Sequence, residues 1–247
     1  MSKAVFIDCP NFLYDLYDEE LRSIVPDLSI NVGDPINGNA APLLDGAVIG
    51  INDHTFMDDK LLRSCKTLRV IVFMGTGASS YIDLSAAEKY GINVRTIINY
   101  GNRSVAEHTI ALMFSAGRQI ASMDRSIRGG HWETLDGIEF EHKILGIVGV
   151  GGIGKEMIRL GNALGMEVLA WNRSEIEQTL PCEVCDLDEL FCRSDVISLH
   201  LSLTEETKNL VNVALSSTDP RDVNYEQLKQ EITTFLVINI FFLICKL

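Results

Sequence analysis

The sequence predicts an α/β protein in which two layered units follow one another along the chain. Residues 1–100 alternate short apolar runs with amphipathic helical patterns, as expected for strands and helices in layers. After Lys143, a glycine-rich turn between an apolar run and a helical pattern opens a second α/β unit. A length of 247 residues is enough for one large domain or two small ones.

Composition and charge limit the classes of partner. An apolar fraction of 47% and a charged fraction of 22% are ordinary for a globular protein, which excludes disorder and collagen-like repeats. The formal net charge of −13 argues against nucleic acid or an anionic membrane as a partner, because both require a basic surface. The 6 cysteines, without a signal-peptide pattern, favour a reducing, cytoplasmic location over a disulfide scaffold.

Apolar runs predict the strands of the first unit. They are rich in Val and Ile and unbroken, which is typical of a parallel sheet buried on both faces. The predicted strands are Ala4–Ile7, Leu28–Val32, Gly46–Gly50, Leu68–Met74 and Ile92–Ile98. Helical patterns between them cover Asp18–Val25, Met57–Cys65 and Leu84–Tyr90.

One long helix is expected to join the two units. Ser104 and Glu107 have the spacing of a capping box, in which both side chains satisfy exposed backbone N–H groups. Arg125 and Arg128 would lie in the last turns, and Gly129-Gly130 would end the helix. A helix of about 25 residues spans about 37 Å, which is long enough to bridge two domains. The joint between the units is therefore placed near residue 102.

The glycine-rich turn is the strongest functional signal. The segment from Gly149 to Gly154 reads Gly-x-Gly-x-x-Gly, follows the predicted strand Ile144–Val148 and precedes a helix and the strand Glu167–Trp171. In this context the motif predicts dinucleotide binding. Gly149 permits the tight turn, Gly151 lets a pyrophosphate approach the backbone, and Gly154 lets the helix pack against its strand. The alternative is a glycine-rich turn without a ligand.

The helix after this turn begins with free backbone N–H groups. Those of Gly152 and Ile153, together with the helix dipole, would attract the phosphates of a dinucleotide. The second strand ends in Asn172-Arg173-Ser174 instead of the acidic residue typical of NAD sites. Arg173 and Ser174 can donate hydrogen bonds to a 2′-phosphate, which favours NADP over NAD. A solvated loop arginine is the alternative.

Several motifs in a fixed order resemble the D-isomer-specific 2-hydroxyacid dehydrogenases, the family of phosphoglycerate and glyoxylate/hydroxypyruvate reductases. The resemblance covers roughly residues 1–212. Its motifs are Gly75-Thr76-Gly77 with Tyr81-Ile82-Asp83, Ser104-Val105-Ala106-Glu107-His108, Arg128-Gly129-Gly130-His131-Trp132, the glycine turn with its strand, and Ser194–His200.

The resemblance implies a flavodoxin-like substrate domain, residues 1–101, followed by an incomplete Rossmann NAD(P)-binding domain, residues 102–247, with an atypical tail from residue 213. The backbone of Gly75, Thr76, Gly77 and Ala78 would bind the carboxylate of a small 2-oxo or 2-hydroxy acid, and a plain strand-to-helix turn is the alternative. His200 would begin the segment that lines the adenine pocket, although Ser202 replaces the usual proline. A homodimer through the Rossmann domain is also implied.

The family's catalytic residues have no counterpart in this sequence, so none is assigned. Hydride transfer between a nicotinamide and C2 of the acid uses a histidine, a carboxylate and an arginine. The sequence departs from the family pattern near Val213. Phe235–Asn239 resembles the strand before the arginine, but a phenylalanine stands where the arginine is expected. The chain is therefore expected to be a fragment or an altered form without useful turnover.

The remaining candidate sites favour structural interpretations. The 5 histidines include His54 and His142 in expected loops and His108 in the first turn of the long helix, and none is expected to replace the catalytic residue. Cys182 and Cys185 lack a second close pair of ligands, so no metal is predicted. The apolar tail Phe235–Cys245 is shorter than the roughly 20 residues that span a bilayer, and a buried strand or an aggregation-prone end is favoured.

Two hypotheses follow. The first is an NAD(P)-dependent 2-hydroxyacid oxidoreductase whose sequence is truncated or altered at its end. The second is a non-catalytic module that binds a dinucleotide or forms dimers.

Overall fold

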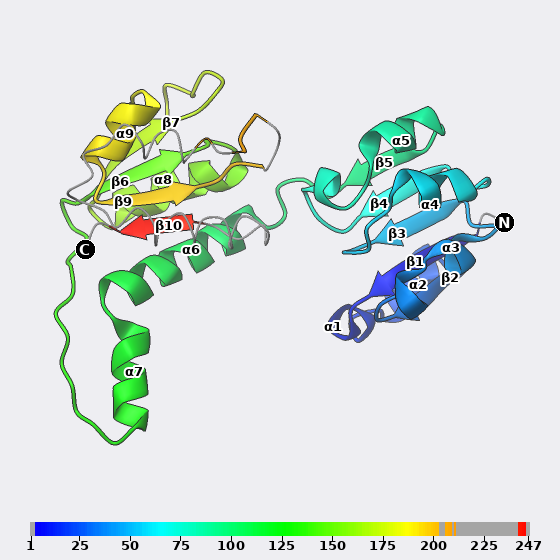
Figure 1. Cartoon of the computed structure of the whole chain (residues 1–247), viewed down its shortest axis with the longest axis horizontal. Helices are drawn as coiled ribbons and strands as arrows, with labels where there is room; N and C mark the ends of the chain where they lie inside the picture. The colour runs from blue at the N-terminus through cyan, green and yellow to red at the C-terminus, as the bar shows by residue number, and fades with distance from the viewer. Residues whose placement is uncertain (1–2, 203–205, 209, 211–241, 246–247) are drawn as a thin grey trace. The chain divides into compact units, whose positions relative to one another are not determined.

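The computed structural model describes residues 3–202, 206–208, 210 and 242–245 (Figure 1). The chain divides into an N-terminal unit, Met1–Tyr100, and a C-terminal unit, Gly101–Leu247. Each unit holds a five-stranded sheet. Among the residues described, no helix is long and apolar enough to cross a membrane.

All five strands of the N-terminal unit run parallel. The strands are β1 (Ala4–Cys9), β2 (Leu28–Val32), β3 (Ile49–Asn52), β4 (Val70–Phe73) and β5 (Asn93–Thr96). Their order is β2-β1-β3-β4-β5, which is the flavodoxin-like order. The predicted α/β class and the flavodoxin-like fold are confirmed.

The prediction that the strands are buried on both faces holds for β1 alone. Every residue of β1 is buried, whereas β3 and β4 alternate between buried and half-buried residues, and the edge strand β5 is largely exposed. Phe6, Ile30 and Ile51 lie in register on one face and line an apolar cavity of about 360 Å³. The chain between β1 and β2 lines the other side of this cavity, which leaves Ile30 of β2 and Ile51 of β3 only half-buried.

Helices connect the strands of this unit. They are α1 (Asn11–Tyr14), α2 (Glu19–Ile24), α3 (Ala41–Leu44), α4 (Asp59–Ser64) and α5 (Leu84–Lys89), with 3₁₀ turns η1 (Ile36–Gly38) and η2 (Ala78–Ser80). Asp18, Asp58 and Asp83 each precede a helix and accept a hydrogen bond from a backbone N–H of its first turn. These N-caps fix where α2, α4 and α5 begin.

The predicted long helix is broken into α6 (Asn102–Gly117) and α7 (Ile120–Arg128). Gln119 adopts the left-handed conformation with φ 55°, and the carbonyl of Gly117 accepts a hydrogen bond from the N–H of Ile138 at 2.8 Å. A β-carbon at Gly117 would clash with the ring of Phe140. A segment distant in sequence therefore crosses the helix at Gly117 and ends it.

The predicted capping box is also wrong. α6 begins two residues before Ser104 with Gly101 as its N-cap, and no side chain caps it. The carboxylate of Glu107 instead accepts a hydrogen bond from Nε of Arg103 at 2.7 Å, an i,i+4 ion pair within the helix. The predicted end of α7 is confirmed, because Gly129 caps it and Gly130 has φ 80°.

The sheet of the C-terminal unit has the order β10-β9-β6-β7-β8. Its parallel strands are β6 (Ile144–Val148), β7 (Glu167–Trp171), β8 (Glu183–Val184) and β9 (Val196–Leu199). Strand β10 (Phe242–Cys245) pairs antiparallel with β9. The strand predicted at Phe235–Asn239, like residues 211–234 of the atypical tail, lies outside the described residues.

Helices α8 (Gly152–Ala163) and α9 (Leu187–Arg193) complete this unit. Met113 of α6 and Met157 and Ile158 of α8 pack with Leu145 and Ile147 of β6 in one hydrophobic core. A second core holds Leu190 and Phe191 of α9 with residues of β6, β7 and β9. The two cores bury both faces of β6 and so hold this strand in place. The glycine-rich turn begins directly after it.

Candidate functional site

The glycine turn follows β6 and adopts a conformation that requires glycine. Gly149 has φ 96°, and a β-carbon there would lie 2.6 Å from the carbonyl oxygen of His200. A β-carbon at Gly154 would clash with the carbonyl oxygen of Gly149, so α8 packs directly against the turn. By contrast, no heavy atom lies within 4 Å of a β-carbon placed at Gly151. The turn is thus closed toward the fold and open at Gly151.

The N-terminus of α8 faces this opening. Gly151 is the N-cap of α8 and offers no side chain to the N–H groups of the first turn, which include those of Gly152 and Ile153. Such N–H groups and the positive end of the helix dipole bind phosphate in other proteins. A β-carbon at Gly152 would clash with the side-chain amide of Asn102, the first residue of α6. Sequence reasoning missed Asn102, because nothing in the local pattern brings residue 102 to residue 152.

The loop after β7 is tied to the turn. Oδ1 of Asn172 accepts a hydrogen bond from the N–H of Val150 at 3.1 Å, and Nδ2 of Asn172 donates to Oγ of Ser174 at 2.9 Å. The Arg173 side chain is 82% exposed and forms an ion pair with Glu206. Asn172, Arg173 and Ser174 therefore lie in a loop fixed to the glycine turn, with the guanidinium on the surface.

His200 lies beside the turn, as its carbonyl contact with Gly149 indicates. Its Nε2 lies 2.8 Å from Oγ of the buried Ser198. Burial lowers the pKa of His200 to about 4, so the imidazole is neutral near pH 7. His200 can therefore shape this edge of the turn but supplies no positive charge to a phosphate.

The Gly75–Ala78 loop follows β4 of the N-terminal unit. The carbonyl of Gly75 accepts a hydrogen bond from the N–H of Ile97 at 3.2 Å, which holds the loop against the segment after β5. Among the hydrogen bonds of the described residues, none is donated by the backbone N–H of Gly75, Thr76 or Gly77. Thr76 is exposed and Gly75 and Gly77 are half-buried, so these donors can meet an anion from solvent.

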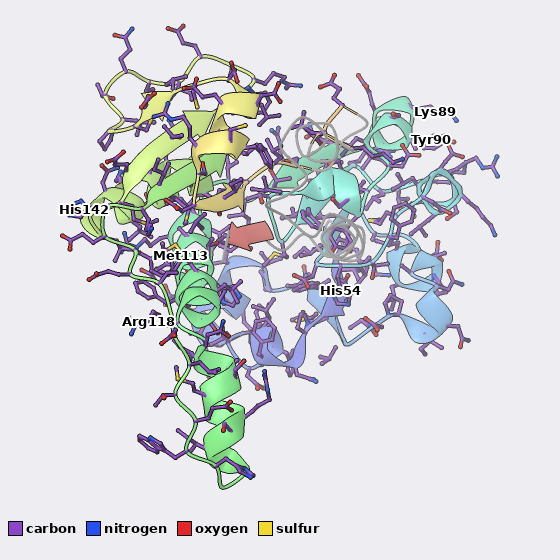
Figure 2. The ribbon with its side chains drawn as sticks, turned by 60° about the vertical axis from the view of Figure 1, so that its left-hand side comes forward. His54, Lys89, Tyr90, Met113, Arg118 and His142 are labelled. Atoms are coloured by element: carbon purple, nitrogen blue, oxygen red, sulfur yellow. The ribbon has the colours of Figure 1, made fainter. Side chains whose placement is uncertain are left out.

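Sequence reasoning assigned His54, which is labelled in Figure 2, to a plain loop and missed the carboxylates around it. Nε2 of His54 lies 2.6 Å from Oδ1 of Asp34, and Nδ1 lies 2.9 Å from Oδ2 of Asp53. These hydrogen bonds, first that to Asp34, raise the pKa of His54. Both ring nitrogens face carboxylates, so the arrangement fits the imidazolium, which donates from both.

The fully buried Asp8 holds the turn that carries His54. Its carboxylate accepts hydrogen bonds from the N–H groups of Asp53, His54 and Thr55 at 2.8, 2.8 and 2.6 Å. Asp8 lies near the carboxyl end of β1, Asp34 lies two residues after β2, and Asp53 directly follows β3. Because these strands are parallel, their carboxyl ends share one edge, and this is the signal that could have located the cluster.

Other sequence candidates are not brought to the glycine turn. Cys182 and Cys185 are half-buried, and burial, with nearby carboxylates, raises the pKa of the Cys185 thiol to about 11. Among the described residues there is no group of three side chains that could hold a metal ion. His142 lies in an exposed turn, and His108 lies in the second turn of α6 and not in its first.

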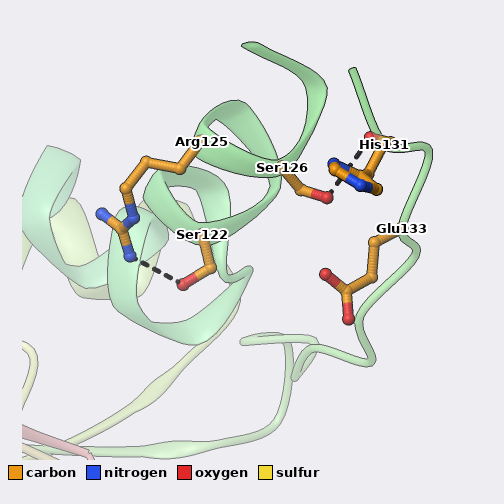
Figure 3. A pocket seen from close by; sticks show the side chains of 5 residues that line it. All are labelled: Ser122, Arg125, Ser126, His131 and Glu133. Carbon is orange, nitrogen blue, oxygen red and sulfur yellow. Dashed lines mark hydrogen bonds between the residues drawn. The ribbon is translucent and has the colours of Figure 1, made fainter. Parts of the chain in front are cut away.

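Helix α7 and the segment after it form an arm that extends away from the sheet of the C-terminal unit (Figure 1). The arm exposes large apolar side chains, with Ile127 at 55% and Trp132 at 86%. Ser122, Arg125, Ser126, His131 and Glu133 line a polar depression on it, in which Nη2 of Arg125 donates to Oγ of Ser122 (Figure 3). Exposed apolar area of this kind is typical of protein interfaces.

Comparison with protein families gives one match in the C-terminal unit. Residues 110–219 match the model of the "D-isomer specific 2-hydroxyacid dehydrogenase, NAD binding domain". A hydroxypyruvate reductase from Thermotoga maritima is 33% identical over 199 residues, covering 80% of this chain and 59% of the relative. A D-3-phosphoglycerate dehydrogenase from Archaeoglobus fulgidus is 36% identical over 168 residues, covering 66% of this chain and 32% of the relative.

A glyoxylate reductase from Aeropyrum pernix is 35% identical over 167 residues, covering 63% of this chain and 50% of the relative. The chain thus spans 32% to 59% of the length of these three relatives. Among solved structures, an acyclic imino acid reductase in complex with NADPH and D-Arg has a TM-score of 0.80 at 25% identity, covering 94% of this chain and 79% of that one. A D-lactate dehydrogenase from Aquifex aeolicus, complexed with NAD and lactic acid, has a TM-score of 0.78 at 25% identity, covering 94% and 74%.

Proposed function

Because the chain belongs to the D-isomer-specific 2-hydroxyacid dehydrogenase family, we propose that its C-terminal unit binds a nicotinamide dinucleotide for hydride transfer to or from a small 2-oxo or 2-hydroxy acid. The observation that carries the proposal is the glycine turn. It is closed toward the fold at Gly149 and Gly154 and open at Gly151, beside the N-terminus of α8. A pyrophosphate needs this opening together with backbone N–H donors.

The described residues suit such a cofactor. The N–H groups of Gly152 and Ile153 would hold the pyrophosphate, with Gly151 leaving room for it. The loop Asn172–Ser174 would meet the adenosine ribose, and the bound nicotinamide would supply or accept the hydride. We favour NADP, because Arg173 can donate to a 2′-phosphate, although Glu206 competes for the same guanidinium.

The N-terminal unit would bind the acid. The exposed N–H groups of the Gly75–Ala78 loop suit the substrate carboxylate, in line with the assignment of residues 1–101 as a substrate domain. The names of the relatives leave the side chain of the acid open, because they include reductases of glyoxylate and hydroxypyruvate and a dehydrogenase of phosphoglycerate.

A non-catalytic module that binds a dinucleotide or forms dimers remains the second candidate. The family match ends at residue 219, and we identify no counterpart of the catalytic arginine, carboxylate or histidine in the sequence. We expect the 247-residue chain to bind cofactor without reducing glyoxylate or hydroxypyruvate, since the loss of one such group costs about a hundred- to a thousandfold in rate.

The exposed apolar arm supports a homodimer as the working form.

Calorimetric titration of the purified chain with NADPH and with NADH tests the dinucleotide site. Binding is expected, and Gly151→Ala should weaken it at least about tenfold, because the added methyl group occupies the space of the pyrophosphate. Unchanged binding in this variant, or no binding by the wild-type chain, would refute the site. A turnover assay with glyoxylate separates the two candidates, because measurable reduction would establish the enzyme and exclude the non-catalytic module.

A further inference from the structure

Helices α6 and α8 of the C-terminal unit begin beside each other. The side chain of Asn102, the first residue of α6, lies against Gly152, the first residue of α8. At the next residue of α6, Nη1 of Arg103 lies 3.6 Å from Oε2 of Glu156 in α8. Each helix has a glycine as its N-cap, so neither N-cap residue provides a capping side chain. Two positive helix ends therefore meet next to the opening at Gly151.

The amide of Asn102 occupies the space that a side chain at residue 152 would need. A β-carbon placed at Gly152 would lie 2.6 Å from Cγ and 2.8 Å from Oδ1 of Asn102. Apart from the backbone of its own helix and turn, the three heavy atoms nearest to this β-carbon all belong to that amide. The motif Gly-x-Gly-x-x-Gly leaves residue 152 variable, so the turn itself does not require glycine there. Glycine at this position instead makes room for Asn102.

The Asn102 amide has the chemistry of a phosphate ligand. Its Nδ2 carries two N–H donors and no charge, and rotation about the Cβ–Cγ bond can turn these donors toward a ligand. The residue is half-buried, so a ligand at the opening can reach it. The neighbouring cation is held elsewhere, because Nε of Arg103 donates to Glu107 at 2.7 Å while its Nη1 faces Glu156. Of these two side chains, the amide is the one available to a phosphate at the N-terminus of α8.

We propose that Asn102 is a further binding residue of the dinucleotide site, whose Nδ2 donates a hydrogen bond to an oxygen of the pyrophosphate. Gly152 is the residue that admits this amide to the site. The inference rests on the proposed function, because it takes the pyrophosphate to lie at the N-terminus of α8. It adds the first turn of α6, which is distant in sequence, to a site that the glycine motif confines to β6 and α8.

Titration calorimetry of the full chain with NADH and with NADPH tests this role, because both cofactors carry the pyrophosphate. Asn102→Ala removes the donor and should weaken the binding of both cofactors by the same factor, at least about tenfold. The affinity for adenosine, which lacks the phosphates, should stay unchanged. Asn93→Ala removes an exposed amide from β5 of the N-terminal unit and should leave all three affinities as they are.

A double-mutant cycle tests the pairing of Asn102 with Gly152. Gly152→Ala adds a methyl group that displaces the amide, so it should weaken the binding of both cofactors about as much as Asn102→Ala. The double variant Asn102→Ala/Gly152→Ala should bind no more weakly than either single variant, because the methyl group then has no amide to displace.

Asn102→Asp separates binding from packing. A carboxylate at the first position of α6, beside the N-terminus of α8, interacts favourably with both helix dipoles, so urea unfolding should show no loss of stability. The same carboxylate repels the pyrophosphate and competes for the N–H groups of α8. Both cofactors should therefore bind to this variant more weakly than to Asn102→Ala, although the variant is at least as stable.

The other outcomes overturn the inference in distinguishable ways. Wild-type affinity of Asn102→Ala for both cofactors, together with weakened binding by Gly151→Ala, would remove Asn102 from the site and leave the proposed function intact. Additive losses in the double variant, or a loss for adenosine as large as that for NADH, would show that Asn102 only packs the two helices. No binding of either cofactor by the wild-type chain would refute the dinucleotide site itself, and this inference with it.

Discussion

The carbonyl oxygen of Gly149 occupies the space that a β-carbon at position 154 would need. Helix α8 can therefore follow the turn only while residue 154 is glycine. The close contact between Gly149 and Gly154 is needed for the fold, whereas the open space at Gly151 is available to the proposed ligand. The two glycines of one motif thus differ in what their replacement should do.

Gly154→Ala is expected to destabilise the chain clearly more than Gly151→Ala. The first change forces the helix away from the turn, at a cost of about 1–3 kcal/mol in the free energy of unfolding. The second puts a methyl group into open space at an N-cap position with φ −79°, at a cost of about 1 kcal/mol or less. Urea unfolding of the variants and the wild-type chain measures both. Equal losses of stability would contradict the assignment of separate roles.

The glycine turn could be predicted from sequence because its geometry depends on neighbouring residues. Strands β6 and β7 have the predicted bounds, and the positive φ of Gly149 follows from the motif. The break between α6 and α7 could not be predicted, because it depends on Ile138 and Phe140, which follow α7 in the chain. The same holds for the His54 cluster, in which Asp8 binds N–H groups 45 to 47 residues away.

Arg173 is expected to determine the choice between NADPH and NADH. Its guanidinium is exposed and would donate to the 2′-phosphate that NADPH carries and NADH lacks. Arg173→Ala should lower the affinity for NADPH about tenfold or more and change that for NADH little. Fluorescence titration with each cofactor gives both values. An equal loss for the two cofactors would show that Arg173 does not contact the 2′-phosphate.

Glu206 is expected to act against NADPH by holding the same guanidinium. Glu206→Gln removes the competing charge and some repulsion of the phosphate, so it should raise the affinity for NADPH by a few fold. The affinity for NADH serves as the internal control and should stay the same. A weaker affinity for NADPH in this variant would mean that Glu206 orients Arg173 toward the cofactor instead of competing with it.

The hydrogen bonds of His54 predict a stability that falls as pH rises. Asp34 and Asp53, with a smaller effect of the buried Asp8, raise its pKa in the folded state above the ordinary value of 6.5. The imidazolium therefore contributes its full stabilisation below pH 6.5 and loses it as the pH rises through the folded-state pKa. Because the ring is 42% exposed, the expected loss is about 1 kcal/mol or less.

Urea unfolding between pH 6 and pH 9 measures this dependence, and NMR titration of the ring gives the pKa directly. His54→Gln keeps a hydrogen-bonding side chain without the charge and should flatten this part of the profile. Cys9 also lies near Asp8 and Asp53. Burial raises the pKa of its thiol above 9.0, so Cys9 titrates at a higher pH than the range measured. A His54 pKa at or below 6.5 would contradict the imidazolium arrangement.

The arm formed by α7 is expected to carry the dimer interface. Ile127 exposes 55% of its surface on the arm. Ile36, which exposes 83% of its surface in the N-terminal unit, serves as the control site for the same substitution. Ile127→Asp should convert a dimer to a monomer, because burying an unpaired carboxylate in an apolar interface costs several kcal/mol. Ile36→Asp should leave the dimer intact. Sedimentation equilibrium gives the mass of each variant, and a wild-type monomer, or a dimer that survives Ile127→Asp, would remove the arm from the interface.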